Sequence, residues 1–487
     1  MAEGRRREYE LLDRIRDGRP MNGRERLELI VRLSVPSILA QLSVIIMFYI
    51  DVSMVGSLGA AASATIGLVE TTGWLFGGLC SSAAIGFSVQ VAHRIGAGDY
   101  AGARAVLRQG LVATTCFGLL IAAVGCAISG PLPVWLGGTE SITADATRYF
   151  RIFALSLPLL QLNYLASGML RSSGNMRVPR ALNLLMCVLD VVFNALLIFP
   201  TRDCTLGGLT LTIPGAGLGV VGAALGTASA EGVTALLMTT YLCRRSPELA
   251  LTQERGSFRP TRATLREALR TGIPIGGEHA VMCGAQILST VIVAPLGNAA
   301  IAANSFAVTA ESLCYMPGYG IGDAATTLVG QCKGARRVDL MRRFGRMTVW
   351  LGMAVMAFMG AVMYAAAPTI LGIMTPDAEI RRLGTEVLRI AAFAEPMFAA
   401  SIVAYGAFVG TGDTIVPSCM NFFSMWCVRL PLAALLVSYL GLKGVWIAMC
   451  IELCFRGTIF LVRLLRGRWL QAAAVAAESA AKAPRSA

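Results

Sequence analysis

The sequence predicts an all-α integral membrane protein in which twelve transmembrane helices form two six-helix bundles related by an internal repeat. Three observations support this fold class. Hydrophobic residues make up 55% of the 487 residues and charged residues only 15%, with a mean hydropathy of +0.64, which is not the composition of a soluble domain. Apolar runs long enough to cross a bilayer recur along the whole chain. The two halves of the chain also match each other at one constant offset.

Each apolar run is expected to be a helix, because lipid offers the backbone no hydrogen-bond partners and only helices or closed barrels satisfy it there. Runs this long and continuous exclude barrel strands. The predicted spans cover residues 28–57, 61–92, 106–128, 147–170, 178–200, 217–243, 268–293, 299–330, 344–366, 384–410, 416–440 and 443–465.

The spans divide the chain into two lobes. Residues 28–243 form the N-lobe and residues 268–466 the C-lobe, and a polar cytoplasmic linker joins them at 244–267. Residues 1–27 are a cytoplasmic extension and 467–487 a cytoplasmic tail, of which the part after Trp469 has low complexity and is expected to be unstructured.

The N-terminal extension is rich in arginine and lacks the short apolar core of a signal peptide. Two structures fit its pattern. The register of Tyr9, Leu11, Leu12 and Ile15 is typical of a short amphipathic helix on the membrane surface, but a disordered segment fits the composition equally well.

The net charge of +13 is distributed in a way that indicates a membrane topology. Nine arginines lie between Arg5 and Arg32, and further basic clusters fall in every second loop. The alternate loops, at 57–61, 201–216 and 294–298, contain only one basic residue, Arg202. This positive-inside asymmetry places both termini in the cytoplasm of a multi-pass protein of the cell (inner or plasma) membrane. A surface that binds nucleic acid would not alternate with the spans, so no nucleic-acid partner is expected.

The internal repeat has an offset of 238 residues and needs no gap over about 150 residues. Matched pairs include Pro36/Pro274, Gly59/Gly297, Gly96/Gly334, Arg104/Arg342, Pro158/Pro396, Gly174/Gly412 and Pro179/Pro417. Six spans per unit give both halves the same orientation, so an axis along the membrane normal should relate them, with a cavity between. Many secondary transporters are built in this way.

One insertion interrupts the repeat after residue 200. Its sequence predicts a small external β-hairpin, in which Thr205–Leu206 and Leu209–Ile213 flank a two-residue glycine turn at 207–208.

Several motifs resemble those of multidrug and toxic compound extrusion (MATE) transporters. They are VPSILAQLSVIIMFYIDVSMVGSLG (35–59), VAHRIGAGDYAGAR (91–104), GMLRSSGNMRVP (168–179), LVGQCKGA (328–335), EP (395–396), GTGDTIVP (410–417) and WCVRLP (426–431). The resemblance covers the chain from about residue 28 to 466 and is closer to the DinF-like branch. It implies two six-helix bundles with a central cleft. It also implies export of amphipathic, often cationic, drugs or metabolites in exchange for protons or sodium ions, and we expect a monomer.

Asp51 and Asp190 are the candidate ion-coupling residues, because a carboxylate inside a membrane span is costly and is functional by default. They match the aspartates of the first and fifth helices in the family. Asn183 and Asn194 lie seven residues before and four after Asp190, on roughly the same helix face. Asn163 and Thr227 are further candidates. For each residue the alternative is a structural polar contact between helices.

The coupling ion is expected to be the proton, with sodium as the alternative. Some sodium-using relatives have an asparagine one turn before the fifth-helix aspartate, where this chain has Met186. In the second repeat, Asp51 and Asp190 correspond to Ser289 and Val428, which places the ionisable chemistry in one lobe.

Other acids within the predicted spans are candidates for the substrate cavity, where negative charge would favour organic cations. They are Glu278, Glu70, Glu311 and Asp323. Glu278 with His279 is an alternative proton relay, although NorM-like members have their glutamate about one turn later, at the position of Met282. Glu452 and Arg456 have the spacing of a structural ion pair, and Arg429 is interpreted as packing at a helix end.

The sequence contains no Walker A motif, no metal-ligand spacing and no nucleophile constellation, so we expect neither an enzyme nor a bound cofactor. A flippase for a lipid-linked precursor is the alternative within transport. A membrane-embedded transferase is disfavoured, because the loops are short and mostly basic.

Overall fold

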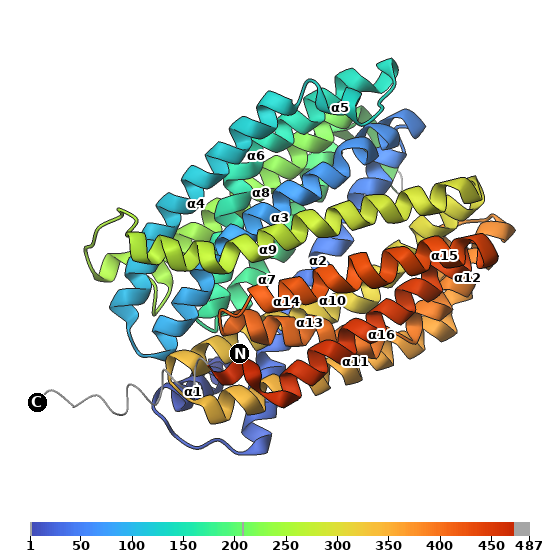
Figure 1. Cartoon of the computed structure of the whole chain (residues 1–487). Helices are drawn as coiled ribbons and strands as arrows, with labels where there is room; N and C mark the ends of the chain where they lie inside the picture. Colours follow the sequence, from blue (N-terminus) through green and yellow to red (C-terminus); the bar gives the residue numbers. More distant parts are fainter. Residues whose placement is uncertain (1, 207–208, 472–487) are drawn as a thin grey trace, which may run out of the picture.

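The computed structural model describes residues 2–206 and 209–471, which form two groups of long helices that diverge from a shared end (Figure 1). The N-lobe consists of α2 (Gly23–Gly56), α3 (Ala60–Gly96), α4 (Tyr100–Ile128), the short α5 (Leu132–Trp135), α6 (Glu140–Ser172), α7 (Arg177–Leu197) and α8 (Gly219–Arg245). The C-lobe consists of α9 (Arg262–Val293), α10 (Asn298–Gly334), α11 (Val338–Met374), α12 (Ala378–Ala392), α13 (Glu395–Gly410), α14 (Ile415–Phe423), α15 (Leu430–Leu440) and α16 (Leu442–Arg466).

Every predicted span is helical. By length and composition, ten helices of the described residues are able to cross a membrane, or eleven if the bent pair α12–α13 counts as one span. Helix α10 is not among them, although it is 37 residues long. More than half of its side chains are buried among other helices, so it has less need of a lipid-compatible surface.

Two C-lobe spans are not regular helices. The chain bends by 57° between α12 and α13, directly before Glu395. Between α14 and α15 the helix widens into a π-helical segment, η3 (Ser424–Arg429). Such bulges are frequent at functional sites.

The predicted external hairpin is confirmed. Strands β1 (Pro200–Leu206) and β2 (Leu209–Ala216) pair antiparallel, with Leu206 opposite Leu209. The glycines of the predicted turn, 207–208, lie outside the described residues.

The backbone confirms the internal repeat at its turns. Left-handed residues occur at equivalent positions, because each turn needs a positive φ that glycine adopts without strain. The pairs are Gly59 (φ 113°) with Gly297 (93°), Gly174 (94°) with Gly412 (77°), and Gly98 (75°) with Arg336 (56°).

The two lobes exchange packing partners. The first helix of each repeat packs against the second helix of the other, since α2 contacts α10 and α9 contacts α3. A Cβ built on Gly320 of α10 would lie 2.6 Å from the backbone nitrogen of Ile38, and one built on Gly276 of α9 would lie 3.0 Å from Ser82 Oγ. These two contacts are equivalent across the repeat, so the lobes meet through reciprocal close approaches.

A second reciprocal pair closes the end of the molecule near α1. A Cβ on Gly96 of α3 would overlap the carbonyl oxygen of Gln331, and a Cβ on Gly334 of α10 would overlap that of His93. His93 and Gln331 are again 238 residues apart. Glycine at both positions lets α3 and α10 cross backbone to backbone at this end.

The N-terminal extension folds into helix α1 (Ala2–Arg16), but its apolar face does not lie on lipid. Leu11, Leu12 and Ile15 are fully buried in a protein cluster that includes the first turns of α2 and residues of α10 and α11. The prediction of an amphipathic helix on the membrane surface is therefore wrong in its location. The apolar stripe is covered by protein because α1 lies beneath the seam where the lobes meet.

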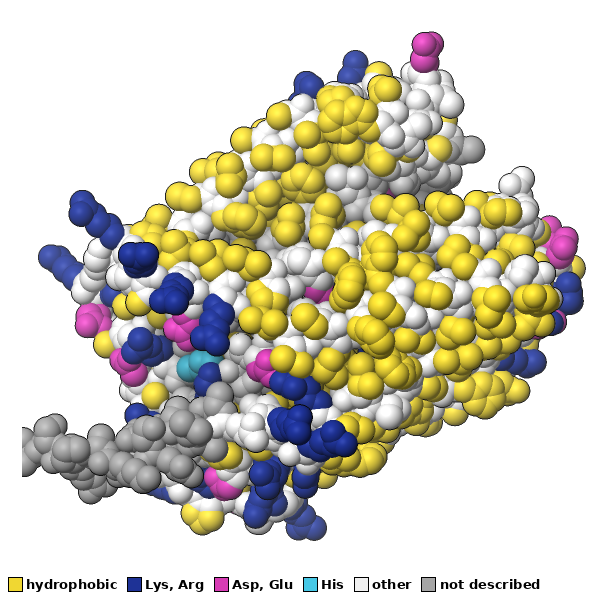
Figure 2. All heavy atoms as spheres, in the orientation of Figure 1, with side chains coloured by type: hydrophobic (Ala, Val, Ile, Leu, Met, Phe, Trp, Pro, Cys, Tyr) yellow, Lys and Arg dark blue, Asp and Glu magenta, His cyan; other side chains and the backbone are white. Residues whose placement is uncertain are grey.

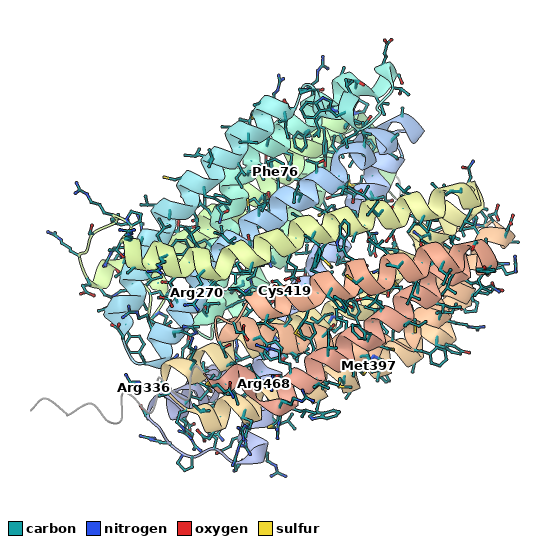
Figure 3. The ribbon with its side chains drawn as sticks, viewed as in Figure 1. Phe76, Arg270, Arg336, Met397, Cys419 and Arg468 are labelled. Atoms are coloured by element: carbon teal, nitrogen blue, oxygen red, sulfur yellow. The ribbon has the colours of Figure 1, made fainter. Side chains whose placement is uncertain are left out.

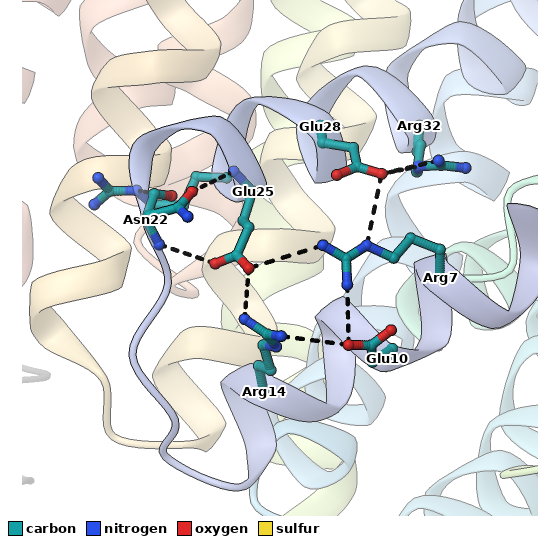
Figure 4. Close-up of polar contacts among 8 residues, drawn as sticks. Arg7, Glu10, Arg14, Asn22, Glu25, Glu28 and Arg32 are labelled. Carbon is teal, nitrogen blue, oxygen red and sulfur yellow. Dashed lines mark hydrogen bonds and ion pairs between the residues drawn. The ribbon is translucent and has the colours of Figure 1, made fainter.

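Charged residues fasten α1 to α2 (Figure 4). Arg14 pairs with Glu25 at 2.6 Å, and Arg7 lies 3.8 Å from both Glu25 and Glu28. The guanidinium of Arg7 also holds the pKa of Glu10 below its ordinary value. Asn22 and Glu25 form a reciprocal cap that starts α2.

The other face of α1 reaches the N-lobe. Glu8 pairs with Arg177 at 2.9 Å, and Arg16 donates to the carbonyl oxygen of Ser173 at 3.4 Å. Because α1 also contacts α10 of the C-lobe, it spans the seam between the lobes.

Part of the predicted C-terminal tail is folded. Residues Arg468–Leu470 form a short 3₁₀ turn, η4, in which Trp469 and Leu470 are buried. The tail from residue 472 onward lies outside the described residues.

On the face shown in Figure 2, most of the visible Lys and Arg side chains gather at the end of the molecule that holds α1. Arg270, Arg336 and Arg468, which are far apart in sequence, all lie toward this end (Figure 3). At the opposite end the lobes are separated by a hollow (Figure 2).

Candidate functional site

Asp51 and Asp190 are brought together by one amide. Nδ2 of Asn194 donates to Oδ1 of Asp51 at 2.8 Å and to Oδ2 of Asp190 at 3.1 Å. Asp190 and Asn194 are fully buried one helical turn apart on α7, while Asp51 on α2 is half-buried. Two carboxylates therefore share one donor in the N-lobe, with one of them closer to solvent.

The rest of the predicted network is only partly assembled. Thr227 of α8 interacts with Asp190. Asn163 is buried, but its amide nitrogen contacts Sδ of Met186 at 3.8 Å, one turn below Asp190. Asn183 is half-buried and makes no hydrogen bond to the two acids. Asn183 and Asn163 thus lie outside the pair that Asn194 bridges.

Glu231 was missing from the sequence prediction. It lies on α8 one turn after Thr227 and interacts electrostatically with Asp190. An acid inside a predicted span is the same signal that identified Asp51, so the rule would have found it.

The first of the acids assigned to the substrate cavity, Glu278 of α9, is held by C-lobe hydrogen bonds. It accepts from Tyr405 at 2.7 Å, from Ser418 at 2.7 Å and from Asn421 at 2.6 Å. His279 points the other way and packs on Gly78 of α3. The two neighbours therefore face different lobes, and a direct relay between them is not assembled.

Asp323 of α10 joins three helices on the seam between the lobes. Its Oδ2 accepts from Arg171 of α6 at 2.6 Å, from Ser37 at 2.9 Å and from Gln41 at 3.2 Å. This carboxylate is committed to closure of the seam, which leaves it little freedom to bind a substrate.

Glu70 keeps the features expected of a substrate contact. It is half-buried on α3 and accepts from Nε1 of Trp74 at 3.2 Å. Trp74 is 57% exposed and stacks edge-on with Phe48 of α2, with ring centroids 6.2 Å apart. An acid beside exposed aromatic rings suits an organic cation.

Buried acids also occur in the C-lobe, so the N-lobe does not hold all of the ionisable side chains. Glu311 is only 5% exposed on α10, and Glu395, at the bend before α13, is 1% exposed and interacts with the thiol of Cys314. The predicted ion pair between Glu452 and Arg456 is confirmed, since Nε of Arg456 lies 2.9 Å from Oε1 of Glu452. Glu311 was among the predicted candidates, whereas Glu395 was named only within the EP motif, although an acid inside an apolar run is the signal that identified Asp51.

Arg429 does not lie at a helix end. It closes the π-helical segment η3 in the middle of the span from Ile415 to Leu440. The interpretation of helix-end packing is therefore wrong.

The described residues contain no group of three or more His, Cys, Asp or Glu side chains able to hold a metal ion. Two pseudo-symmetric helical lobes, a hollow between them and a pair of acids inside the predicted spans are typical of a secondary membrane transporter. A family model described as MatE matches residues 36–196 and again 274–435, and its two matches begin 238 residues apart. The chain belongs to the MatE family, which confirms that it is a multi-pass transporter and not an enzyme.

Curated relatives agree over nearly the whole chain. The chain is 25% identical over 451 residues to the probable multidrug resistance protein NorM of Thermotoga maritima, covering 92% of this chain and 94% of that one. It is 29% identical over 429 residues to the protein of the same name from Pseudomonas aeruginosa, covering 86% and 85%.

Solved structures share the fold. A crystal structure of MATE in complex with MaL6 superposes with a TM-score of 0.83 at 23% identity, covering 92% of this chain and 96% of that one. A structure described as the outward-facing conformation of a multidrug resistance MATE family transporter gives 0.82 at 24% identity, covering 91% and 96%. The all-helical, multi-span fold in two lobes is thus confirmed, with ten or eleven candidate spans among the described residues against the twelve predicted.

Proposed function

We propose that this transporter exports amphipathic, cationic small molecules in exchange for protons that bind at Asp51 and Asp190. The observation that carries the proposal is the amide of Asn194, which holds the two carboxylates together. Adjacent carboxylates in a low-dielectric site resist double ionisation, and a proton is the simplest charge that relieves their repulsion. The difference in exposure gives the pair a route to solvent through Asp51.

The contacts favour the proton over sodium. Asn194 directs N–H groups at both acids, which occupies the place a cation would need. The amide of Asn163 contacts Met186, which offers sulfur where a hard cation requires oxygen. The first-lobe acids also support assignment to the DinF-like branch, although the named relatives are NorM proteins.

Alternation follows from differential affinity. In the state in which the cleft is open at the end opposite α1, protons bind the acid pair and the cleft releases its substrate. In the opposite state the pair deprotonates and the cleft binds the next cation. Each ligand biases the equilibrium only by its different affinity for the two states. Two observations support a cationic substrate. The relatives are named as multidrug resistance proteins, and Glu70 lies beside the aromatic rings of Trp74 and Phe48.

The charge distribution supports a cell-membrane location with both termini in the cytoplasm, and the relatives named above are bacterial. We expect a monomer.

Dye efflux from proteoliposomes tests the proposal, with a pH gradient and a sodium gradient imposed separately. We expect proton-driven efflux in the parent and a loss of at least about tenfold in Asp51→Asn, because the neutral amide cannot bind and release a proton. Asp145→Asn is the matched control, since Asp145 is 51% exposed at the outer end of α6.

The other outcomes are informative. Sodium-driven efflux would keep the antiporter and overturn proton coupling. If neither gradient moved any of a broad panel of cationic dyes, the flippase alternative would replace the efflux function.

A further inference from the structure

The C-lobe contains an arginine inside the membrane with no oxygen acceptor among the described residues. Nη2 of Arg429 donates to Sδ of Met449 at 3.1 Å, and Nη1 donates to Sδ of Met425 at 3.8 Å. Thioethers are weak acceptors, whereas a guanidinium presents five N–H donors and remains charged. An intramembrane charge normally pairs with an opposite charge, so this arrangement requires an explanation.

Nearby acids do not supply the partner. None of the described carboxylates lies within 4.0 Å of Arg429, although Glu311 and Glu452 interact with it electrostatically at longer range. Glu452 is already engaged by Arg456 and by the hydroxyl of Ser424. The positive charge of Arg429 is therefore not neutralised by direct contact.

Arg429 instead lines a small polar cavity. The cavity measures ≈ 20 Å³, more than the roughly 10–15 Å³ that one water-sized group needs. Its polar wall is made by Gln286, Ser289, Thr290 and Asn304. Trp446, whose indole can only donate, fixes the amide oxygen of Asn304 at 2.9 Å and so leaves the two amide N–H groups of Asn304 to donate elsewhere.

The internal repeat shows what this cavity corresponds to. Ser289 is the counterpart of Asp51, and Val428, directly before Arg429, is the counterpart of Asp190. The N-lobe thus carries two carboxylates at positions where the C-lobe carries a hydroxyl and a valine, and the guanidinium of Arg429 follows one residue after that valine. Ser289 and Arg429 line the same cavity, which therefore presents donors and a positive charge beside the counterpart of Asp51.

We propose that this cavity binds one small monovalent anion, of the size of chloride, against Arg429, Ser289 and Asn304. The guanidinium supplies the charge, and the hydroxyl and amide complete a shell of donors. The cavity is too small for an organic anion as a whole. The anion neutralises Arg429 in the low-dielectric lobe, as a paired carboxylate would. This site is independent of the proton pair in the N-lobe.

Thermal unfolding of the full chain in detergent tests the proposal. The melting temperature in sodium chloride is compared with that in sodium gluconate at the same ionic strength. A ligand that binds the folded state raises the melting temperature with its concentration. We expect a saturable rise with chloride in the parent. In Arg429→Gln the half-maximal concentration should increase at least about tenfold, because a charge-assisted contact is lost. Arg148→Gln, at a side chain that is 69% exposed, is the matched control and should behave as the parent.

A second variant keeps the test sharp if Arg429→Gln fails to fold. Ser289→Asp places a carboxylate on the wall beside Arg429, as in the first lobe. It should remove the chloride dependence and raise the melting temperature in gluconate, because the arginine then has a covalently attached counter-ion.

Bromide gives a direct readout by anomalous diffraction from crystals grown in sodium bromide. We expect a peak beside Arg429 in the parent and none there in Ser289→Asp. If the parent melts at the same temperature in both salts and shows no peak, the cavity holds water only and the proposal is wrong.

Discussion

At the scale of single residues, Arg336 has a left-handed backbone conformation. The equivalent position in the first repeat is occupied by a glycine, Gly98. Arg336 has φ 56°, whereas Gly98 has φ 75°, and no atom lies within 4 Å of a Cβ built on Gly98. The two turns therefore differ in backbone strain. A side chain in the left-handed region costs about 1–2 kcal/mol.

We expect Gly98→Ala to lower the free energy of unfolding by about 1 kcal/mol, because alanine resists this φ. Arg336→Gly should leave it unchanged or raise it, since relief of strain offsets the greater freedom of glycine in the unfolded chain. Thermal unfolding of both variants in the same detergent measures this. Equal destabilisation by both substitutions would contradict the argument.

Sequence reasoning identified only part of the network around the two N-lobe acids proposed to bind the coupling ion. Asp51, Asp190 and Asn194 were predicted and meet at 2.8 and 3.1 Å. Asn183 lies seven residues from Asp190, a spacing that places both on one face of the helix. Such a spacing does not show which side chain on a neighbouring helix that face contacts. The long-range contacts of Asp323 with Arg171 and Ser37 could not be predicted, because they depend on how the lobes meet.

At the scale of elements, α1 is the helix whose role the sequence left open. Its periodicity was visible, but a stripe of Leu11, Leu12 and Ile15 fits lipid and protein equally well. The choice is made by residues far away. A Cβ on Gly174, in the turn before α7, would overlap the side chain of Leu12, and Arg177 pairs with Glu8.

The ion pair between α1 and α7 gives a reversible test. Arg177→Glu replaces the guanidinium that lies 2.9 Å from Glu8 with a like charge, and should lower the free energy of unfolding by about 2 kcal/mol because Glu8 is only 3% exposed. The double variant Glu8→Arg with Arg177→Glu should recover most of the loss, measured by thermal unfolding.

Arg180→Glu is the matched control, one turn along α7, because no ion pair of Arg180 appears among the described residues. If the double variant is no more stable than Arg177→Glu alone, the contact does not hold α1 in place.

Span boundaries were predicted within several residues, yet two irregularities inside the spans were not. The 57° bend before Glu395 and the π-helical turn that ends at Arg429 both fall in continuous apolar runs. Hydropathy reports how far a run reaches and is insensitive to breaks within it. Pro396 would have been a fair signal for the bend, since proline is favoured in the first turn of a new helix.

At the scale of the whole molecule, the two lobes are held together by helices that pack backbone to backbone. The contact at Gly96 with Gln331 and its equivalent at Gly334 with His93 leave no room for a side chain. The sequence predicted two lobes and their common orientation, but it did not predict that they exchange partners. The offset reveals which residues are equivalent and says nothing about which of them touch.

Alanine at the crossing should separate the lobes at this end. We expect Gly96→Ala to lower the free energy of unfolding by about 1–3 kcal/mol, because the new methyl group collides with backbone that cannot move independently. Gly334→Ala should have a similar effect. Gly67→Ala, also in α3, is the control, since no atom lies within 4 Å of its Cβ and alanine favours the helix. A Gly96→Ala variant as stable as Gly67→Ala would refute the crossing.

The reciprocity of these contacts has a consequence for the history of the chain. The contact of His93 with Gly334 is equivalent to that of Gln331 with Gly96. The contact of Ile38 with Gly320 is equivalent in the same way to that of Gly276 with Ser82. This is the signature of an isologous interface, in which the same patch on two copies is self-complementary about a two-fold axis. Each half carries one side of every such contact, which is the arrangement by which two copies of a six-helix protein would pair as a homodimer. Fusion of two copies needed only the segment after α8 as a tether, and it freed each half to diverge.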